Sequence, residues 1–479
     1  MGANMQRVGI YINIALALFI GALGLSWVTH GTGIIRNDPD RHIAIPKPLT
    51  IPLQVKAAYT AQDIFIRYRW PSPQPGIYHD VLRYQDGKWV VEGQPVPGSE
   101  PNGLAEDRVA MMLDDGSVPE FARYGGYITV GDGITSFSQS ADTKAVRAHA
   151  DFGQRLKQVE VSKYLPATRT VIGDWSALAS EADLAAQRNA GYFLDLWHWR
   201  AHRSNPLNIS DDQHIAAARF SDAGRSPYST NWNNDTKQPR VMMDQAKSGR
   251  KSLRWDDLVQ GKLGFGDVYF LRADQAVPFD ANAGWVEGDT LPRRILTMAD
   301  GSRGDIAVSG EGRWKDGFWD VTLRRRLDTG HPQDDKILRD QGGYHVAFSV
   351  HRNAQQERWH YVSLPFTLGL NRPADIVAPK FAGEAPDWKQ AWTEVTLFYP
   401  GQVSWPHLNS KKHGGADSIK KGVPVKYRHS EVQLAHYGVE AEFAGAIRRQ
   451  WLFTLLAGLL LIAGFGVSLN LLLKRKQGV

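Results

Sequence analysis

The greatest density of chemically capable side chains lies in residues 195–206, which read Asp-Leu-Trp-His-Trp-Arg-Ala-His-Arg-Ser-Asn-Pro. On an extended strand the indoles of Trp197 and Trp199 share one face, and His198 lies on the other. On a helix, His198 and His202 would instead stand one turn apart, a spacing that metal sites use. The pattern therefore favours a half-buried, tryptophan-rich strand, with a pair of metal-binding imidazoles as the alternative.

Two further places offer side chains that can bind a metal. Met111 and Met112 adjoin in a predicted strand, so they point to opposite faces and at most one of them faces a given pocket. A thioether can fill a core or act as an axial ligand of haem iron. Far downstream, His360 lies between Trp359 and Tyr361, where it is either an ordinary half-buried histidine or an iron ligand in an aromatic pocket.

Several kinds of chemistry are excluded by what the sequence lacks. The 479 residues contain no cysteine, which excludes disulfides, thiolate zinc sites, cysteine nucleophiles and covalently attached c-type haem. The serine-hydrolase elbow, the HExxH motif and the P-loop are also missing. Paired aspartates at 114–115 and 211–212 could hold a hard cation, but such pairs are more often solvated turn residues. The net charge of +6 is small and forms no basic stripe, so nucleic acid is not an expected partner.

Short alternating runs of β-branched and aromatic residues, separated by turn residues, predict the strands that would position these groups. The predicted strands are 51–59, 63–70, 78–84, 88–92, 107–113, 266–271, 304–309, 318–326, 344–351 and 360–370. Weak helical spacing at 144–159 and 176–187 predicts helices within an insertion at about 140–260. The predicted fold is a mainly β, antiparallel sandwich with helical insertions.

Apolar runs at both ends predict membrane helices. Residues 8–28 form an uncharged run of 21 residues and 451–473 one of 23, each long enough for a bilayer core of ~30 Å. The basic residues 474–476 and Arg7 would keep both ends in the cytoplasm, so the expected topology is two-pass in the inner membrane with a periplasmic domain. A cleaved signal peptide is the alternative for the first run. The expected parts are an anchor at 1–30, the β domain at 31–429, and a juxtamembrane helix with a second anchor at 430–479.

Several separated stretches together resemble the ethylbenzene dehydrogenase-related cytochromes, which include the haem b-binding gamma subunits of ethylbenzene dehydrogenase and dimethyl sulfide dehydrogenase. The matching stretches, in the family's order, are 51–70, 106–112, 194–212 with its WHWRAHRSNP core, 312–319 with 324–329, and 346–370. The resemblance implies a sandwich related to carbohydrate-binding modules, in which a Met and a Lys hold the iron of haem b. It places the methionine at Met112, with Met111 as the near alternative, and finds His360 where the family has its lysine. The implied cofactor is one non-covalent haem b with a Met/His ligand pair.

One part of the family pattern is missing from this chain. Relatives with an additional c-type haem carry CxxCH after the methionine strand, where this chain has RYGGYITVGD at 123–132, so no haem c is expected. His198 and His202 are then relics of such a site, ligands of haem b or structural residues, and we favour structural roles. Trp199 and Arg203 from the same stretch are further candidates for the cofactor pocket.

The resulting expectation is a membrane-anchored b-type cytochrome that transfers electrons within a respiratory or photosynthetic complex and performs no bond chemistry itself. Its expected partners are a cytochrome b-like or molybdenum-enzyme subunit, a small electron carrier and membrane lipid. One alternative is a structural or assembly subunit without haem. The other is a glycan-binding module that uses exposed Trp197 or Trp199 as a stacking platform.

Overall fold

The computed structural model describes residues 2–29, 50–93, 104–126, 141–161, 163–171, 174–310, 312–352, 361–398 and 431–475. The chain divides into two compact units. The first consists of Met1–Asp38 with His436–Val479, and the second is Pro39–Ala435.

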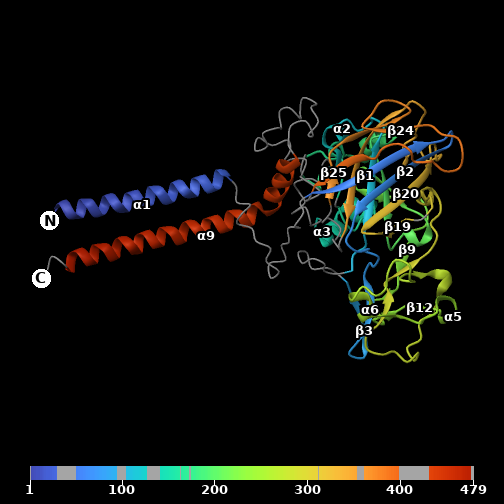
Figure 1. Cartoon of the computed structure of the whole chain (residues 1–479), viewed down its shortest axis with the longest axis horizontal. Coiled ribbons are helices and arrows are strands. Elements are labelled where there is room, and N and C mark those ends of the chain that lie inside the picture. The colour runs from blue at the N-terminus through green and yellow to red at the C-terminus, as the bar shows by residue number, and fades with distance from the viewer. Residues whose placement is uncertain are drawn as a thin grey trace. The chain divides into compact units, whose positions relative to one another are not determined.

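The largest sheet of the second unit has 14 strands among the described residues, and its main path runs in the order β18-β20-β2-β1-β25-β22-β21-β5-β6-β7-β8. Off this path, β19 pairs with β20, and β23 pairs with β21 and β24. Figure 1 labels β1, β2, β19, β20, β24 and β25 of this sheet. All its pairings are antiparallel except that of β23 with β24. The strands are β1 (Thr50–Tyr59), β2 (Asp63–Pro71), β5 (Arg108–Asp114), β6 (Leu194–Arg200), β7 (Asp211–Ile215), β8 (Arg219–Ser221), β18 (Ala307–Val308), β19 (Arg313–Lys315), β20 (Phe318–Arg326), β21 (Gly343–His351), β22 (Tyr361–Ser363), β23 (Phe366–Leu370), β24 (Ile376–Ala378) and β25 (Thr393–Phe398). The prediction of a mainly β, antiparallel fold is confirmed.

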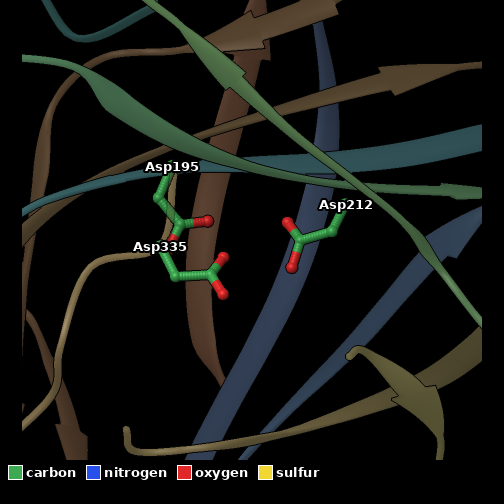
Figure 2. A group of neighbouring side chains, drawn as sticks. All are labelled: Asp195, Asp212 and Asp335. Carbon is green, nitrogen blue, oxygen red and sulfur yellow. The ribbon is translucent and has the colours of Figure 1, made fainter. Parts of the chain in front are cut away.

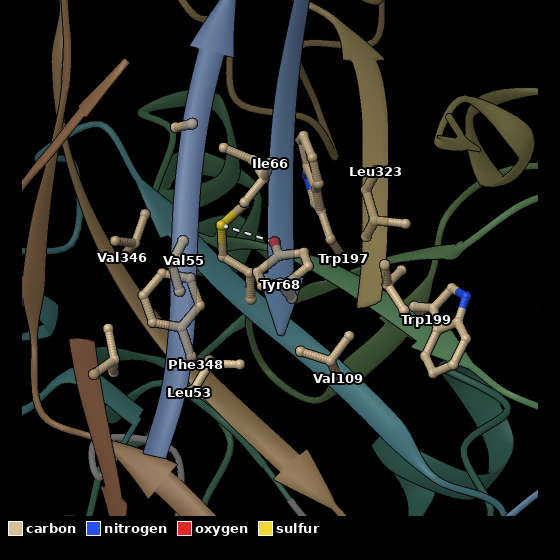
Figure 3. Packing of buried hydrophobic residues seen from close by; sticks show 14 of the residues in the cluster. Leu53, Val55, Ile66, Tyr68, Val109, Trp197, Trp199, Leu323, Val346 and Phe348 are labelled. Carbon is tan, nitrogen blue, oxygen red and sulfur yellow. Dashed lines mark hydrogen bonds between the residues drawn. The ribbon is translucent and has the colours of Figure 1, made fainter. Parts of the chain in front are cut away.

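The sheet curls so that its two halves face each other across the main hydrophobic core, which Figure 3 shows from close by. Tyr68 on β2 donates a hydrogen bond to the sulfur of Met111 on β5 at 3.5 Å. The rings of Trp70 and Trp199 meet edge to face at 5.8 Å. Because side chains alternate along a strand, the residues next to these core residues point to the outer face of the sheet.

A second apolar cluster covers that outer face over β5, β6 and β22. It joins Met112, Leu196 and Val362 to Phe121 of the short helix α2 (Phe121–Tyr124) and to Leu165. The sheet is therefore covered on this side by the two segments around residues 118–126 and 163–165. The candidate site lies between these segments and the strands.

Smaller elements complete the second unit. A separate four-stranded sheet, β13-β16-β3-β4, has its own apolar cluster. Its hairpin turns at Asp86 and Gly87, whose φ angles of 51° and 73° fit the turn that this dipeptide predicts. The remaining strands are β3 (Val81–Gln85), β4 (Lys88–Glu92), β9 (Tyr228–Thr230), β10 (Trp232–Asn233), β11 (Gln238–Pro239), β12 (Val241–Met243), β13 (Leu253–Arg254), β14 (Leu271–Arg272), β15 (Ala276–Pro278), β16 (Asp289–Pro292) and β17 (Arg294–Leu296).

The helices of the second unit are short. They are α3 (Thr143–Ala148), η4 (Ala150–Arg155), η5 (Pro166–Thr168), α4 (Glu181–Asn189), η6 (Asn205–Leu207), α5 (Gln245–Ser248), α6 (Trp255–Val259), η7 (Ala273–Gln275) and η8 (Ser302–Gly304). Of these, α3, η4 and α4 overlap the two helical stretches predicted at 144–159 and 176–187.

The first unit consists of two long helices, α1 (Gly2–Thr29) and α9 (Glu431–Arg475). They pack antiparallel, because Ile12 lies against Gly466 while Trp451 donates a hydrogen bond to the carbonyl of Leu23 at 3.3 Å. Helix α9 is continuous from Glu431, in the segment predicted to be juxtamembrane, through the second apolar segment. Among the described residues one segment, Trp451–Lys474, is long and apolar enough to cross a membrane; the apolar part of α1, Gly9–Gly24, is shorter.

Candidate functional site

A pocket lies on the outer face of the sheet, between the strands and the segments that cover them. Its floor comes from strands β5 to β8, β21 and β22, while Gly126 and Lys163 line it from the covering segments. The floor residues are Arg108, Ala110, Met112, Leu196, His198, Ile215, Arg219, Ala347, Ser349, His351 and Val362. The pairing of β5 with β6 sets Ala110 opposite His198 and Met112 opposite Leu196, so a thioether and an imidazole rise diagonally from one face.

The thioether of Met112 lies against the covering segment. A Cβ atom at Gly126 would lie 2.4 Å from Val362 Cγ1 and 3.4 Å from Met112 Cε, so only glycine leaves room for this close approach. Met112 is buried, with 7% of its surface exposed. Its sulfur is thus held in an apolar part of the pocket, where it can act as a soft ligand.

His198 presents one ring nitrogen to the pocket without a partner. Arg200 Nη2 lies 3.0 Å from His198 Nδ1, and because a guanidinium is always a donor, this contact makes Nδ1 the acceptor. Gln213 Oε1, at 3.2 Å from the same nitrogen, would suit the other tautomer, but the charged donor is closer and decides the assignment. Nε2 then carries the proton, and among the described residues nothing accepts it. Burial, followed by the charges of Arg200 and Arg108, keeps the pKa of His198 well below its usual value, so the ring stays neutral.

Cationic side chains surround the polar end of the pocket. Arg108 and Arg219 line it from β5 and β8, and Lys163 lines it from the covering segment. Arg219 Nη2 also donates to Glu160 Oε1 at 2.7 Å. Arg108 Nε lies 3.7 Å from Glu106 Oε1. The pocket therefore combines a soft sulfur, nitrogen ligands and apolar walls with guanidinium groups that favour an anion.

This donor set fits haem b, which needs axial ligands for iron, apolar contacts for its ring and cations for its propionates. The space enclosed by the described side chains is about 40 Å³, which is room for one or two water molecules and far less than a porphyrin needs. A porphyrin would therefore have to displace the covering segments around Gly126 and Lys163 from the sheet.

The candidate residues on the opposite face of β5 and β6 do not reach the pocket. Met111 packs in the main core, where its sulfur accepts the hydrogen bond of Tyr68. Trp199 is fully buried there as well, and its indole donates to Asn205 Oδ1 at 3.1 Å. Trp197 is equally buried. The expectation that a glycan could stack on exposed Trp197 or Trp199 is therefore wrong, because the core covers both rings.

His202 and Arg203 lie beyond the pocket, bound to one buried carboxylate. The backbone N–H groups of both residues donate to Glu106 Oε2 at 2.7 and 2.8 Å, and Arg203 Nε donates to Glu106 Oε1 at 2.5 Å. The Nδ1–H of His202 donates to the carbonyl of Ile77 at 2.9 Å. Because β6 is a strand and the chain turns after Arg200, the alternative of a helical His198–His202 metal pair is wrong.

Two other sequence predictions concern His360 and the paired aspartates. His360, the predicted second iron ligand, lies outside the described residues. The paired aspartates were expected to be solvated turn residues, but Asp114, Asp211 and Asp212 are fully buried, and only Asp115 is exposed. Guanidinium and ammonium partners make this possible: the partly buried Arg303 Nε donates to Asp211 Oδ1 at 2.7 Å, for example.

Sequence reasoning missed Lys163, Arg108, Arg219, His351 and Gly126 as pocket residues. The adjacent glycines 125 and 126 carried a signal, because residues without a Cβ atom allow a close approach of the backbone to its neighbours. Lys163 carried none, since its place over β5 depends on how the chain returns to the sheet after the helical insertion.

Comparisons with known proteins add two findings to this geometry. Residues 37–363 match the protein family described as "Ethylbenzene dehydrogenase", and this match spans β5, β6 and every lining residue of the pocket. A stretch of 77 residues is 30% identical to "Cytochrome c-552" from Stutzerimonas stutzeri, covering 16% of this chain and 26% of that protein. The chain thus spans about a quarter of the length of this curated relative. Since the family match covers well over half of the sequence, the chain belongs to the ethylbenzene dehydrogenase family.

Proposed function

We propose that this protein is a b-type cytochrome that holds one non-covalent haem b in the pocket over β5 and β6. The observation that carries the proposal is the placement of the Met112 thioether in a pocket with a lysine, two histidines and two arginines. The family match and the similarity to a cytochrome c-552 over part of the chain support it. Bound haem would supply reversible one-electron chemistry, and the protein would supply its ligands, its burial and its access.

Met112 and Lys163 are the ligand pair that this geometry favours. Two residues that would hold the iron of haem b should come from different walls of the pocket. Met112 rises from the sheet and Lys163 comes from the segment over it, whereas Met112 and His198 rise from the same face. The amine of Lys163 would bind metal in its neutral form. His360 remains the prediction drawn from sequence resemblance, and variants of both residues distinguish the two assignments.

The neutral imidazole of His198 suits hydrogen bonding to an anion better than binding of the iron. With its proton on Nε2, this ring is a hydrogen-bond donor aimed into the pocket. Arg108 and Arg219 lie at the same end. We assign these three side chains to the propionates of the haem, where their donors would offset two negative charges.

The cytochrome would be anchored in the inner membrane and transfer electrons on the periplasmic side. Trp451–Lys474 supports an anchor by its length and apolar composition. We propose that α1 lies beside it as a second span, because Phe19 packs over Gly458 so closely that a Cβ there would lie 1.7 Å from the ring. The electron partners would be a molybdenum-enzyme or cytochrome b-like subunit and a small carrier.

The test is to purify the full chain in mild detergent and record oxidised and reduced absorption spectra with a pyridine haemochrome assay. We expect about one b-type haem per chain and a low-spin spectrum. Lys163→Ala should give a five-coordinate spectrum, while His198→Gln should keep low-spin iron with weaker haem retention.

Two results would contradict these assignments. A flat visible spectrum after haem-replete expression would reject the cytochrome and favour the subunit without haem. An unchanged spectrum in Lys163→Ala together with a five-coordinate spectrum in His360→Ala would reject Lys163 and establish His360 as the ligand.

A further inference from the structure

Three buried aspartates meet on the core side of β6, on the face opposite the pocket. Asp195 belongs to β6, Asp212 to β7, and Asp335 to the segment that follows β20. Figure 2 shows their carboxylates pointing toward one another, and one oxygen from each lies within 4.8 Å of the other two. The first two are fully buried and Asp335 is 2% exposed.

The negative charge of this cluster exceeds the positive charge that contacts it. Arg325 Nη1 lies 2.6 Å from Asp195 Oδ2, 3.1 Å from Asp335 Oδ1 and 3.8 Å from Asp212 Oδ2. Lys336 adds only its backbone N–H, because its ammonium pairs with Asp115 at 2.8 Å. One guanidinium therefore faces three carboxylates in a buried site, where unbalanced charge is costly.

Two oxygens in the cluster have no hydrogen-bond donor among the described residues. They are Asp195 Oδ1 and Asp212 Oδ2. The other oxygens are used, since Asp212 Oδ1 accepts from the N–H of Gln213 at 3.1 Å and Asp335 Oδ2 accepts from Thr329 at 2.6 Å. A buried carboxylate oxygen without a donor is strongly destabilising unless a cation or a proton binds it.

We propose that Asp195, Asp212 and Asp335 bind one divalent cation of the Ca²⁺ type. The ligands are all oxygen, which hard cations prefer, and their spacing can be bridged by contacts of 2.3–2.6 Å. Mg²⁺ fits less well because it holds shorter contacts, strict octahedral geometry and several water molecules. Two positive charges added to that of Arg325 would balance the three carboxylates.

Such an ion would connect the two ends of the curled sheet. Asp195 and Asp212 lie near one end, and Asp335 follows β20 near the other. The same strand β6 carries His198 on its pocket face. Binding of the cation would therefore stabilise the fold and keep the pocket strand in place, without contact between the ion and the pocket.

Terbium, a luminescent substitute for Ca²⁺, provides the direct test. Trp197 can sensitise its emission, because the Trp197 ring lies 4.7 Å from the guanidinium carbon of Arg325. We expect EDTA-treated full chain in detergent to bind about one Tb³⁺ with tryptophan-sensitised emission, and Ca²⁺ to displace it. Ca²⁺ should also raise the midpoint of thermal unfolding.

Substitution of the proposed ligands tests whether the cation binds at these aspartates. Asp212→Asn and Asp335→Asn should each lose the Tb³⁺ emission and the Ca²⁺-dependent rise, whereas the matched control Asp289→Asn, a buried aspartate paired with Arg254, should keep both. The proposal would be overturned if Ca²⁺ left the midpoint of thermal unfolding of the unmodified chain unchanged and Tb³⁺ gave no tryptophan-sensitised emission. This test uses the unmodified chain, so it holds even if a variant fails to fold. Asn variants that unfold at a higher temperature than the unmodified chain in EDTA would instead show that shared protons neutralise the cluster.

Discussion

Met111 and Met112 adjoin in sequence but lie in different surroundings, since one packs in the main core and the other faces the pocket. Met112→Leu keeps the volume and removes the thioether. We expect it to change the free energy of unfolding by less than about 1.5 kcal/mol while the low-spin haem spectrum is lost. Absorption spectra and chemical unfolding of the same samples give both quantities. Met111→Leu is the control and should keep the spectrum; equal spectra for both variants would contradict ligation by Met112.

Gly126 is the residue whose substitution should disturb the pocket most directly. In Gly126→Ala the new Cβ would lie 2.4 Å from Val362 Cγ1, so the covering segment or β22 must shift. We expect a loss of about 1–3 kcal/mol in unfolding free energy and a lower ratio of haem to protein. Gly266→Ala, which has nothing within 4 Å of its new Cβ, should leave both unchanged within error. Full haem occupancy in Gly126→Ala would contradict this prediction, because it would show that the covering segment can move away from β22 without loss of haem binding.

At the scale of elements, the sequence predicted the central strands that carry the site, but not β7 and β8 or the segments that close it. Alternation in β5 and β6 correctly separated Met112 from Met111 and His198 from its tryptophan neighbours, because the side-chain period of a strand is a local property. The position of Lys163 depends instead on the return of the chain after the helical insertion, which no local pattern encodes. The buried aspartates were missed for a similar reason, since Arg325 lies 130 residues away from Asp195 in sequence.

The pairing of α1 with α9 is a second feature of element scale that sequence alone left open. Because the chain has no cysteine, introduced cysteines report on this contact without interference. We expect Phe19→Cys with Gly458→Cys to form a cross-link with a short thiol-specific reagent in native membranes. After proteolysis between the helices, the two fragments should then remain joined.

The control for this prediction uses the opposite side of α9. Phe19→Cys with Gly464→Cys should give little cross-link, because nothing lies within 4 Å of a Cβ at Gly464. Equal cross-linking of both pairs, or of neither, would contradict the antiparallel packing and with it the proposed second span.

At the scale of the whole molecule, buried carboxylates should set how stability depends on pH. Burial alone would raise the pKa of Glu106, but the charges of Arg203 and Arg108 outweigh it and lower the pKa from 4.5 to about 2. A lowered pKa in the folded state contributes stability that is present above pH 4.5 and is lost as the pH falls toward 2. For Glu106 this contribution is about 3 kcal/mol.

The pKa of Asp114 is shifted in the opposite direction from that of Glu106. Burial raises its pKa from 3.8 to about 6 even though Lys336 lowers it, and burial likewise raises the pKa of Asp195. A raised pKa of an acid in the folded state gives stability that is present below pH 3.8 and is lost as the pH rises through about 6. In EDTA, the shifts of Glu106 and Asp114 should therefore make the free energy of unfolding highest near pH 4–5 and lower on both sides.

The free energy of unfolding, measured with denaturant from pH 2 to 8, would show separately the loss of stability at acid pH and the loss at neutral pH. Glu106→Gln should flatten the acid limb while lowering stability overall, because it leaves Arg203 without its buried counter-charge. Glu384→Gln, at an exposed position, should leave the curve unchanged. Ca²⁺ should raise stability more at pH 7 than at pH 4, because the cation competes with protons for the Asp195 cluster and binds only its ionised form. A Ca²⁺ effect of equal size at both pH values would place the ion elsewhere.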